Sequence, residues 1–125
     1  MKNTLRSLIL VTLSTSTAAL ADDVADGFTV YSTANWSNVK VVNINNPSVT
    51  CKETGKVLSG STLVFSKEEL NSAPLQACYA SKSFGLIFYG NISNNPFPPQ
   101  FAKPGQRCTA NYKMLSGLVF SCQTM

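Results

Sequence analysis

The chain contains no histidine and few charged residues of either sign. Only 13% of its 125 residues are Asp, Glu, Lys or Arg, about half of the roughly 25% typical of soluble domains. Histidine is the side chain whose unperturbed titration lies between about pH 5 and 8, so its absence excludes Ser–His and Cys–His nucleophiles. No apolar run approaches the roughly 20 residues of a membrane-spanning helix. The composition therefore argues against a transmembrane protein and against most familiar hydrolytic enzymes.

Carboxylates are also scarce. After Asp26 the sequence holds only Glu53, Glu68 and Glu69. Glu68 and Glu69 are neighbours in an expected helix, where successive side chains point about 100° apart, so they cannot face one substrate together. Without histidine or clustered acids, the chain offers no set of metal ligands. We therefore predict a protein without catalytic residues, bound metal or cofactor.

The first 21 residues have the pattern of a secretory signal peptide. Lys2 and Arg6 precede a short apolar run, and Ala19-Leu20-Ala21 forms a small-residue cleavage site. We expect cleavage after Ala21 and a single secreted domain, residues 22–125. The body of this domain has a modest basic bias that favours anionic partners, but its basic residues are spread out, as ordinary solubilising charge would be.

All four cysteines, Cys51, Cys78, Cys108 and Cys122, follow the expected signal peptide. An even number of cysteines in a secreted chain predicts two disulfides. The sequence has no C-x-x-C pair, which argues against a zinc site. Four cysteines allow three connectivities. We favour the nested pairing Cys51–Cys122 with Cys78–Cys108, in which the outer bridge ties the first core strand to the last.

Runs of β-branched and aromatic residues predict several strands and one helix. Strands are expected at 28–31, 39–44, 49–51, 62–65, 84–89, 108–114 and 118–122. The segment Ser66-Lys67-Glu68-Glu69 is a capping box, in which Ser66 accepts from the Glu69 amide and the Glu69 carboxylate reaches back to the Ser66 amide. The helix should begin at Lys67, and Pro74 should stop or restart it. The whole predicts an α+β fold, one short helix packed on an antiparallel β-sheet with two disulfides.

Aromatic residues outside the expected strands are the candidate binding residues. Trp36, Phe97 and Phe101 lie in an expected turn or in the proline-rich loop 91–106, and loops of this length are often functional. Beside Lys103 and Arg107, exposed rings could stack on bases or fill a partner's pocket. The alternative interpretation is that all three rings cap the edges of a small core.

The order of elements resembles that of small secreted fungal ribonucleases of the guanyl-preferring type, and more closely the ribonuclease-like effectors of plant-pathogenic fungi. The resemblance covers about residues 49–122, and includes Pro104-Gly105-Gln106-Arg107 before the final hairpin. It implies a helix on an antiparallel sheet and a bridge from the first strand to the C-terminus, corresponding to Cys51–Cys122. The family's enzymes use histidines and a glutamate, and here only Arg107 has a counterpart. The resemblance therefore implies a catalytically dead relative that binds something. Residues 22–48 have no counterpart in it, and the alternative fold is a different small β-sandwich with two disulfides.

These features together predict a secreted, monomeric, non-enzymatic, effector-like virulence protein of a plant-pathogenic fungus. Its expected partner is a host protein or RNA, bound through the sheet face and the proline-rich loop. The competing interpretation is a secreted inhibitor of a hydrolase or a small antimicrobial protein. In that case the loop 91–106 would enter a target's cleft as a rigid wedge.

Overall fold

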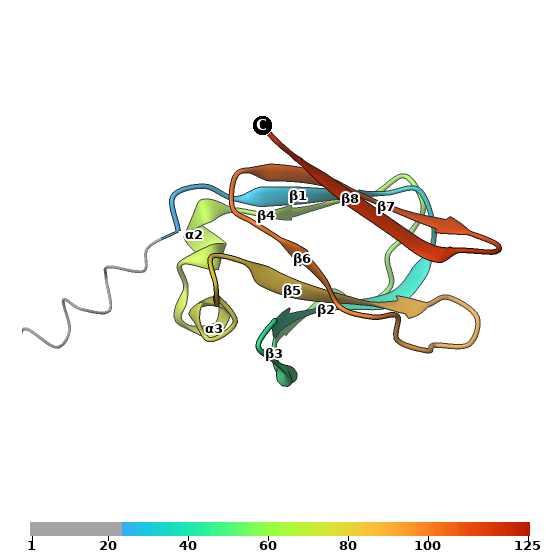
Figure 1. Ribbon diagram of the computed structural model, residues 1–125, viewed down its shortest axis with the longest axis horizontal. Coiled ribbons are helices and arrows are strands. Elements are labelled where there is room, and N and C mark those ends of the chain that lie inside the picture. The colour runs from blue at the N-terminus through green and yellow to red at the C-terminus, as the bar shows by residue number, and fades with distance from the viewer. Residues whose placement is uncertain (1–23) are drawn as a thin grey trace, which may run out of the picture.

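A computed structural model describes residues 24–125, in which two four-stranded β-sheets face each other, with two short helices at one end (Figure 1). The expected signal peptide and its cleavage site lie outside these residues. In chain order the elements are β1 (Phe28–Ser32), β2 (Trp36–Asn43), β3 (Asn46–Glu53), β4 (Thr62–Phe65), α2 (Lys67–Leu70), α3 (Ala73–Gln76), β5 (Phe84–Gly90), β6 (Gln100–Ala102), β7 (Gln106–Lys113) and β8 (Gly117–Thr124).

Each sheet combines strands from both halves of the chain. One sheet has the order β4-β1-β7-β8, and the other has the order β3-β2-β5-β6. The neighbours β1 and β7 run parallel, and the remaining strand pairs of residues 24–125 are antiparallel. The fold is therefore mostly β, and the prediction of one antiparallel sheet covered by a helix is wrong in that respect. A four-residue helix spans little more than one turn, which is too short to cover the apolar face of a four-stranded sheet. The second sheet covers that face instead.

The core lies between the two sheets. Phe28 of β1 stacks on Phe65 of β4 within one sheet, with ring centroids 4.7 Å apart, and contacts Phe84 of β5 in the other at 6.0 Å. Phe88 of β5 likewise lies 5.6 Å from Phe120 of β8. Burying a side chain of this size contributes about 1.5–3 kcal/mol. Strand β1, FTVYS, places alternate residues on its inner face, whereas β5, FGLIFYG, is apolar along most of its length.

The capping box is half formed. The Ser66 hydroxyl accepts from the Glu69 amide at 3.1 Å, as predicted, and α2 begins at Lys67. The Glu69 carboxylate does not turn back to Ser66; it pairs with the Lys52 ammonium on β3. A neighbouring strand thus competes for the carboxylate, which the local pattern could not show. Pro74 restarts the chain as α3, also as predicted.

The disulfides join Cys51 to Cys78 and Cys108 to Cys122. The predicted nested pairing, Cys51–Cys122 with Cys78–Cys108, is therefore wrong. Its premise was that the strand of Cys51 and the last strand are neighbours, but β3 and β8 belong to different sheets. The structure instead bridges Cys108 to the residue directly opposite it on β8. The bridge to the C-terminus that the ribonuclease resemblance implied is not formed.

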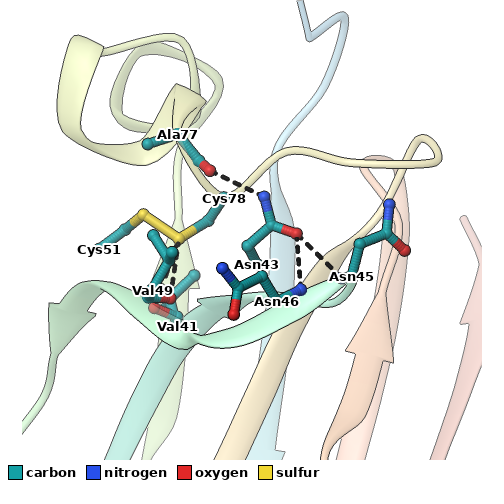
Figure 2. Close-up of a disulfide and its surroundings, with 8 residues drawn as sticks. All are labelled: Val41, Asn43, Asn45, Asn46, Val49, Cys51, Ala77 and Cys78. Carbon is teal, nitrogen blue, oxygen red and sulfur yellow. Dashed lines mark hydrogen bonds between the residues drawn. A yellow bond between two sulfur atoms is a disulfide. The ribbon is translucent and has the colours of Figure 1, made fainter.

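The Cys51–Cys78 bridge ties the chain after α3 to the edge strand β3 (Figure 2). Cys78 is completely buried, and its Sγ contacts the carbonyl oxygens of β2 and β3. Beside it, the Asn43 amide donates to the carbonyl oxygen of Ala77 at 3.0 Å. The Asn43 Oδ1 accepts from the backbone amides of Asn45 at 2.9 Å and Asn46 at 3.3 Å, where β2 turns into β3. Bridge and turn together hold the helical segment against the sheet.

Neither helix of residues 24–125 is long and apolar enough to cross a membrane.

Candidate binding surfaces

The five residues predicted to bind a partner are distributed over three places. Trp36 and Phe97 meet edge to face, with centroids 5.7 Å apart, at the end of the sandwich away from the helices. Phe101 and Lys103 line a cleft between β6 and β8. Arg107 is exposed on β7. The residues therefore do not form one site.

Trp36 belongs to the core. Its side chain is 1% exposed, and its indole N–H donates to the buried Ser32 hydroxyl at 2.8 Å. The Ser32 hydroxyl in turn donates to the carbonyl oxygen of Ala34 at 2.6 Å. The indole thus presents no open face to a ligand, and the interpretation of a core-capping ring fits this residue.

The proline-rich loop follows β5 back along the sheet. The Phe97 amide donates to the carbonyl oxygen of Phe88 at 2.9 Å, and the Gly90 amide donates to that of Asn95 at 2.8 Å. Phe97 is half-buried against the core. These contacts hold residues 95–97 against β5, and the structure does not favour a wedge that projects into a target.

A cleft of about 280 Å³ runs between the edge strands β6 and β8, and we call it the β6–β8 cleft. Its lining residues are Gln100, Phe101, Lys103, Gln106, Phe120, Ser121 and Cys122. Phe101 is 56% exposed, and Phe120 is half-buried beside Phe88 of the facing sheet. The cleft thus combines two aromatic side chains with a single cation, Lys103.

Strand β8 forms one wall of this cleft, and alternate residues along it direct their backbone groups away from β7. The carbonyl oxygen of Ala110 accepts from the Thr33 amide beyond β1 at 2.9 Å, so it does not bond to Phe120, its opposite residue. In an antiparallel ladder, every second residue pair lacks mutual hydrogen bonds. Because Ala110 and Phe120 form such a pair, every second residue of β8 counted from Phe120 also points its N–H and C=O groups to the open edge. These residues are Leu118, Phe120, Cys122 and Thr124.

The other edge strands carry features that discourage pairing, whereas β8 does not. β3 contains Pro47 and charged residues at its end, β4 has four residues, and β6 has three. Short strands, charges and proline are the usual protections of a sheet edge. β8 has eight residues, GLVFSCQT, with neither a charge nor a proline. Among the edges formed by residues 24–125, β8 is the one open to an added strand.

A second surface, which we call the loop end, comprises residues 33–35, 55–60, 91–95 and 113–117. A shallow pocket of about 300 Å³ here is lined by Trp36, Phe97, Tyr112 and the turn Gly90–Ser93. Three aliphatic side chains protrude beyond it: Ile92 is 97% exposed, Met114 87% and Leu115 101%. None of the three is among the five residues predicted to bind a partner. The signal available was two adjacent apolar residues, Met114 and Leu115, in a turn that polar residues normally occupy.

Two of the carboxylates are held by neighbouring side chains. Residues 24–125 contain no group of three His, Cys, Asp or Glu side chains able to hold a metal ion. Glu69 is engaged by Lys52, and Glu53 accepts from the Asn38 amide at 2.8 Å. Both carboxylates are therefore occupied by structural contacts.

Comparison of the chain with known proteins finds no matching family model, curated protein or solved structure. The function must therefore be argued from these two surfaces.

Proposed function

We propose that the chain is a secreted, non-catalytic protein that binds an extended segment of a host protein by adding it as a strand to β8. The observation that supports this most directly is the open, uncharged edge of β8. A peptide added to a sheet edge gains affinity from main-chain hydrogen bonds, which β8 offers at four residues. Two disulfides fit the expected secretion, since such bridges persist in oxidising compartments.

The β6–β8 cleft would supply specificity. Side chains of an added strand alternate between its two faces, so every second one would enter the cleft against Phe101 and Phe120. The opposite side chains would lie beside Val119 and Ser121, which face away from the core. We expect the preferred segment to carry apolar residues at alternate positions.

RNA is the less favoured partner. Single strands are bound by grooves in which several cations follow the phosphates. Lys103 is the one cation lining the β6–β8 cleft. Arg107 projects from the other face of β7, because Cys108 next to it points into the core. We therefore propose that an effector-like role would be carried out by protein binding. This proposal does not depend on the ribonuclease resemblance.

The test begins with extended peptides selected from a display library on the folded, oxidised protein. In ¹⁵N spectra, a selected peptide should shift the amides of Leu118, Phe120 and Cys122 and slow their hydrogen exchange. Amides of β8 that already bond to β7, such as those of Val119 and Ser121, should change less. Shifts confined to another surface would contradict the proposal, as would tighter binding of single-stranded RNA than of any peptide.

A matched pair of variants distinguishes strand addition at β8 from nonspecific peptide binding. Val119→Lys with Ser121→Lys places charges on the outward side of β8, where they discourage strand addition. The control, Val64→Lys, changes an exposed residue at the opposite edge of the same sheet. Peptide affinity should fall at least about tenfold in the first variant, the loss of roughly 1.4 kcal/mol, and stay unchanged in the second.

A further inference from the structure

The loop end is an apolar surface at one extremity of the molecule. The β7–β8 hairpin and the loop after β5 lie there together, at the end opposite α2 and α3 (Figure 1). Ile92 protrudes from the loop after β5, and Met114 and Leu115 protrude from the hairpin turn. Leu58, in a third loop, is also exposed. Aliphatic side chains gathered in this way usually mark an interaction surface.

These loops rest on a rigid base. A Cβ atom placed on Gly117 would lie 3.2 Å from the Phe97 ring, so the hairpin packs closely on the aromatic cluster. The Ser59 amide donates to Asn35 Oδ1 at 2.8 Å and joins the loop of Leu58 to the pocket rim. Ile92 and Tyr112 line the same pocket. The protruding side chains are therefore presented by one continuous surface.

Within the four segments of the loop end the charge has one sign, although one carboxylate, Glu53, lies beside them at the end of β3, where it accepts from Asn38. The four segments of the loop end contain Lys56 and Lys113 and no Asp or Glu. By contrast, Glu68 and Glu69 lie in α2 at the far end, where Asp26 also sits near Gly105. The half-exposed Tyr112 is placed behind the aliphatic tips. This surface combines exposed apolar side chains at its tip with a tyrosine behind them and lysines in the same segments. Such a combination is typical of surfaces that enter a membrane interface.

We propose that the loop end docks on a lipid bilayer that carries anionic headgroups. Ile92, Met114 and Leu115 would enter the boundary between headgroups and acyl chains, where apolar area is removed from water. The two lysines would lie near the headgroups, whose negative surface potential attracts basic side chains. A second copy of the chain fits less well, because end-to-end contact would bring lysines against lysines.

This inference is independent of the proposed strand addition, because it uses different residues and a different part of the surface. The lysine substitutions on β8 should therefore leave lipid binding intact. Conversely, a change in the hairpin turn should leave peptide binding at β8 intact.

Co-sedimentation of the oxidised protein with vesicles tests the proposal. The protein should bind vesicles of phosphatidylcholine with phosphatidylserine, and bind vesicles of phosphatidylcholine alone more weakly. Met114→Ser with Leu115→Ser should lower binding to the anionic vesicles at least about tenfold, because apolar burial is lost. Lys56→Gln with Lys113→Gln should remove most of the preference for phosphatidylserine. Val64→Ser, an exposed aliphatic residue outside the loop end, is the control and should bind as the wild type does.

Three results would overturn the proposal. The first is no binding to either vesicle, and the second is unchanged binding by the Met114→Ser, Leu115→Ser variant. The third is a concentration-dependent dimer in light scattering that this variant abolishes, which would assign the loop end to a second copy of the chain. Because both substituted residues are almost fully exposed, an unchanged thermal unfolding curve verifies that the variant is folded.

Discussion

Cys108 and Cys122 face each other across β7 and β8, with their Cα atoms 4.0 Å apart. A close approach of this kind is typical of antiparallel pairs that do not exchange hydrogen bonds. The backbone groups of Cys122 therefore point to the open edge, while its side chain anchors β8 to the sheet. A covalent link between opposite residues also prevents β8 from sliding along β7, and a slip of one residue would reverse every side chain. The same bridge thus maintains the edge and the wall of the β6–β8 cleft.

Peptide mapping under non-reducing conditions tests both bridges directly. Trypsin should separate the four cysteines into peptides 41–52, 68–82, 108–113 and 114–125, because lysine or arginine precedes each one. We expect 41–52 linked to 68–82, and 108–113 linked to 114–125. A linked pair of 41–52 and 114–125 would restore the nested pairing and contradict the two-sheet fold.

Trp36 should act as a core residue. Trp36→Phe removes volume from a buried site and leaves the Ser32 hydroxyl without its indole donor. We expect the free energy of unfolding to fall by about 1–3 kcal/mol, measured in urea by circular dichroism. Tyr112→Phe, in the half-exposed neighbour of Trp36, is the control and should change stability by less than about 0.5 kcal/mol. Equal effects of the two substitutions would contradict the buried placement of the indole.

Gly27 marks a close approach between two backbone segments. A Cβ atom at this position would lie 2.3 Å from the carbonyl oxygen of Phe65, so Gly27→Ala must displace the start of β1 or the junction between β4 and α2. We expect a loss of at least about 2 kcal/mol of unfolding free energy. Gly55→Ala provides the comparison, because its Cβ would meet no atom within 4 Å and only the positive φ of 76° opposes it. That change should cost about 1 kcal/mol, and a reversed order would show that Gly27 does not lie against the junction between β4 and α2.

The two halves of the capping box should differ in their contribution to stability. Ser66→Ala removes the acceptor for the Glu69 amide, and we expect it to cost about 1 kcal/mol. Glu69→Gln weakens the pairing with Lys52, but both side chains are about one-third exposed, so the loss should be no more than about 0.5 kcal/mol. Both values can be measured by urea unfolding at low and high salt, and only the second should depend on salt. A salt-dependent loss in Ser66→Ala would place the Glu69 carboxylate back on the cap.

Local sequence patterns correctly predicted much of the secondary structure. The β-branched residues of 39–44 predict one strand, and the nearly continuous apolar run 84–89 predicts a central strand buried on both faces. Ser66 and Pro74 indicate where the two helices begin, because capping and the missing proline N–H act within a few residues. Four cysteines behind a signal-like segment likewise predicted two disulfides. All these inferences depend on interactions within a short stretch of chain.

Only the tertiary structure decided which strands are neighbours, and the remaining features follow from that arrangement. The partner of each cysteine depends on sheet order, so the same four residues allowed three pairings until β3 and β8 were placed in different sheets. The open edge of β8 and the cleft beside Phe101 arise in the same way, from strands distant in the sequence. The prediction that Trp36 lies in a turn is wrong: it begins β2 and is buried because Phe88 and Phe97 pack around it. Residue type is a local property, whereas exposure depends on long-range packing.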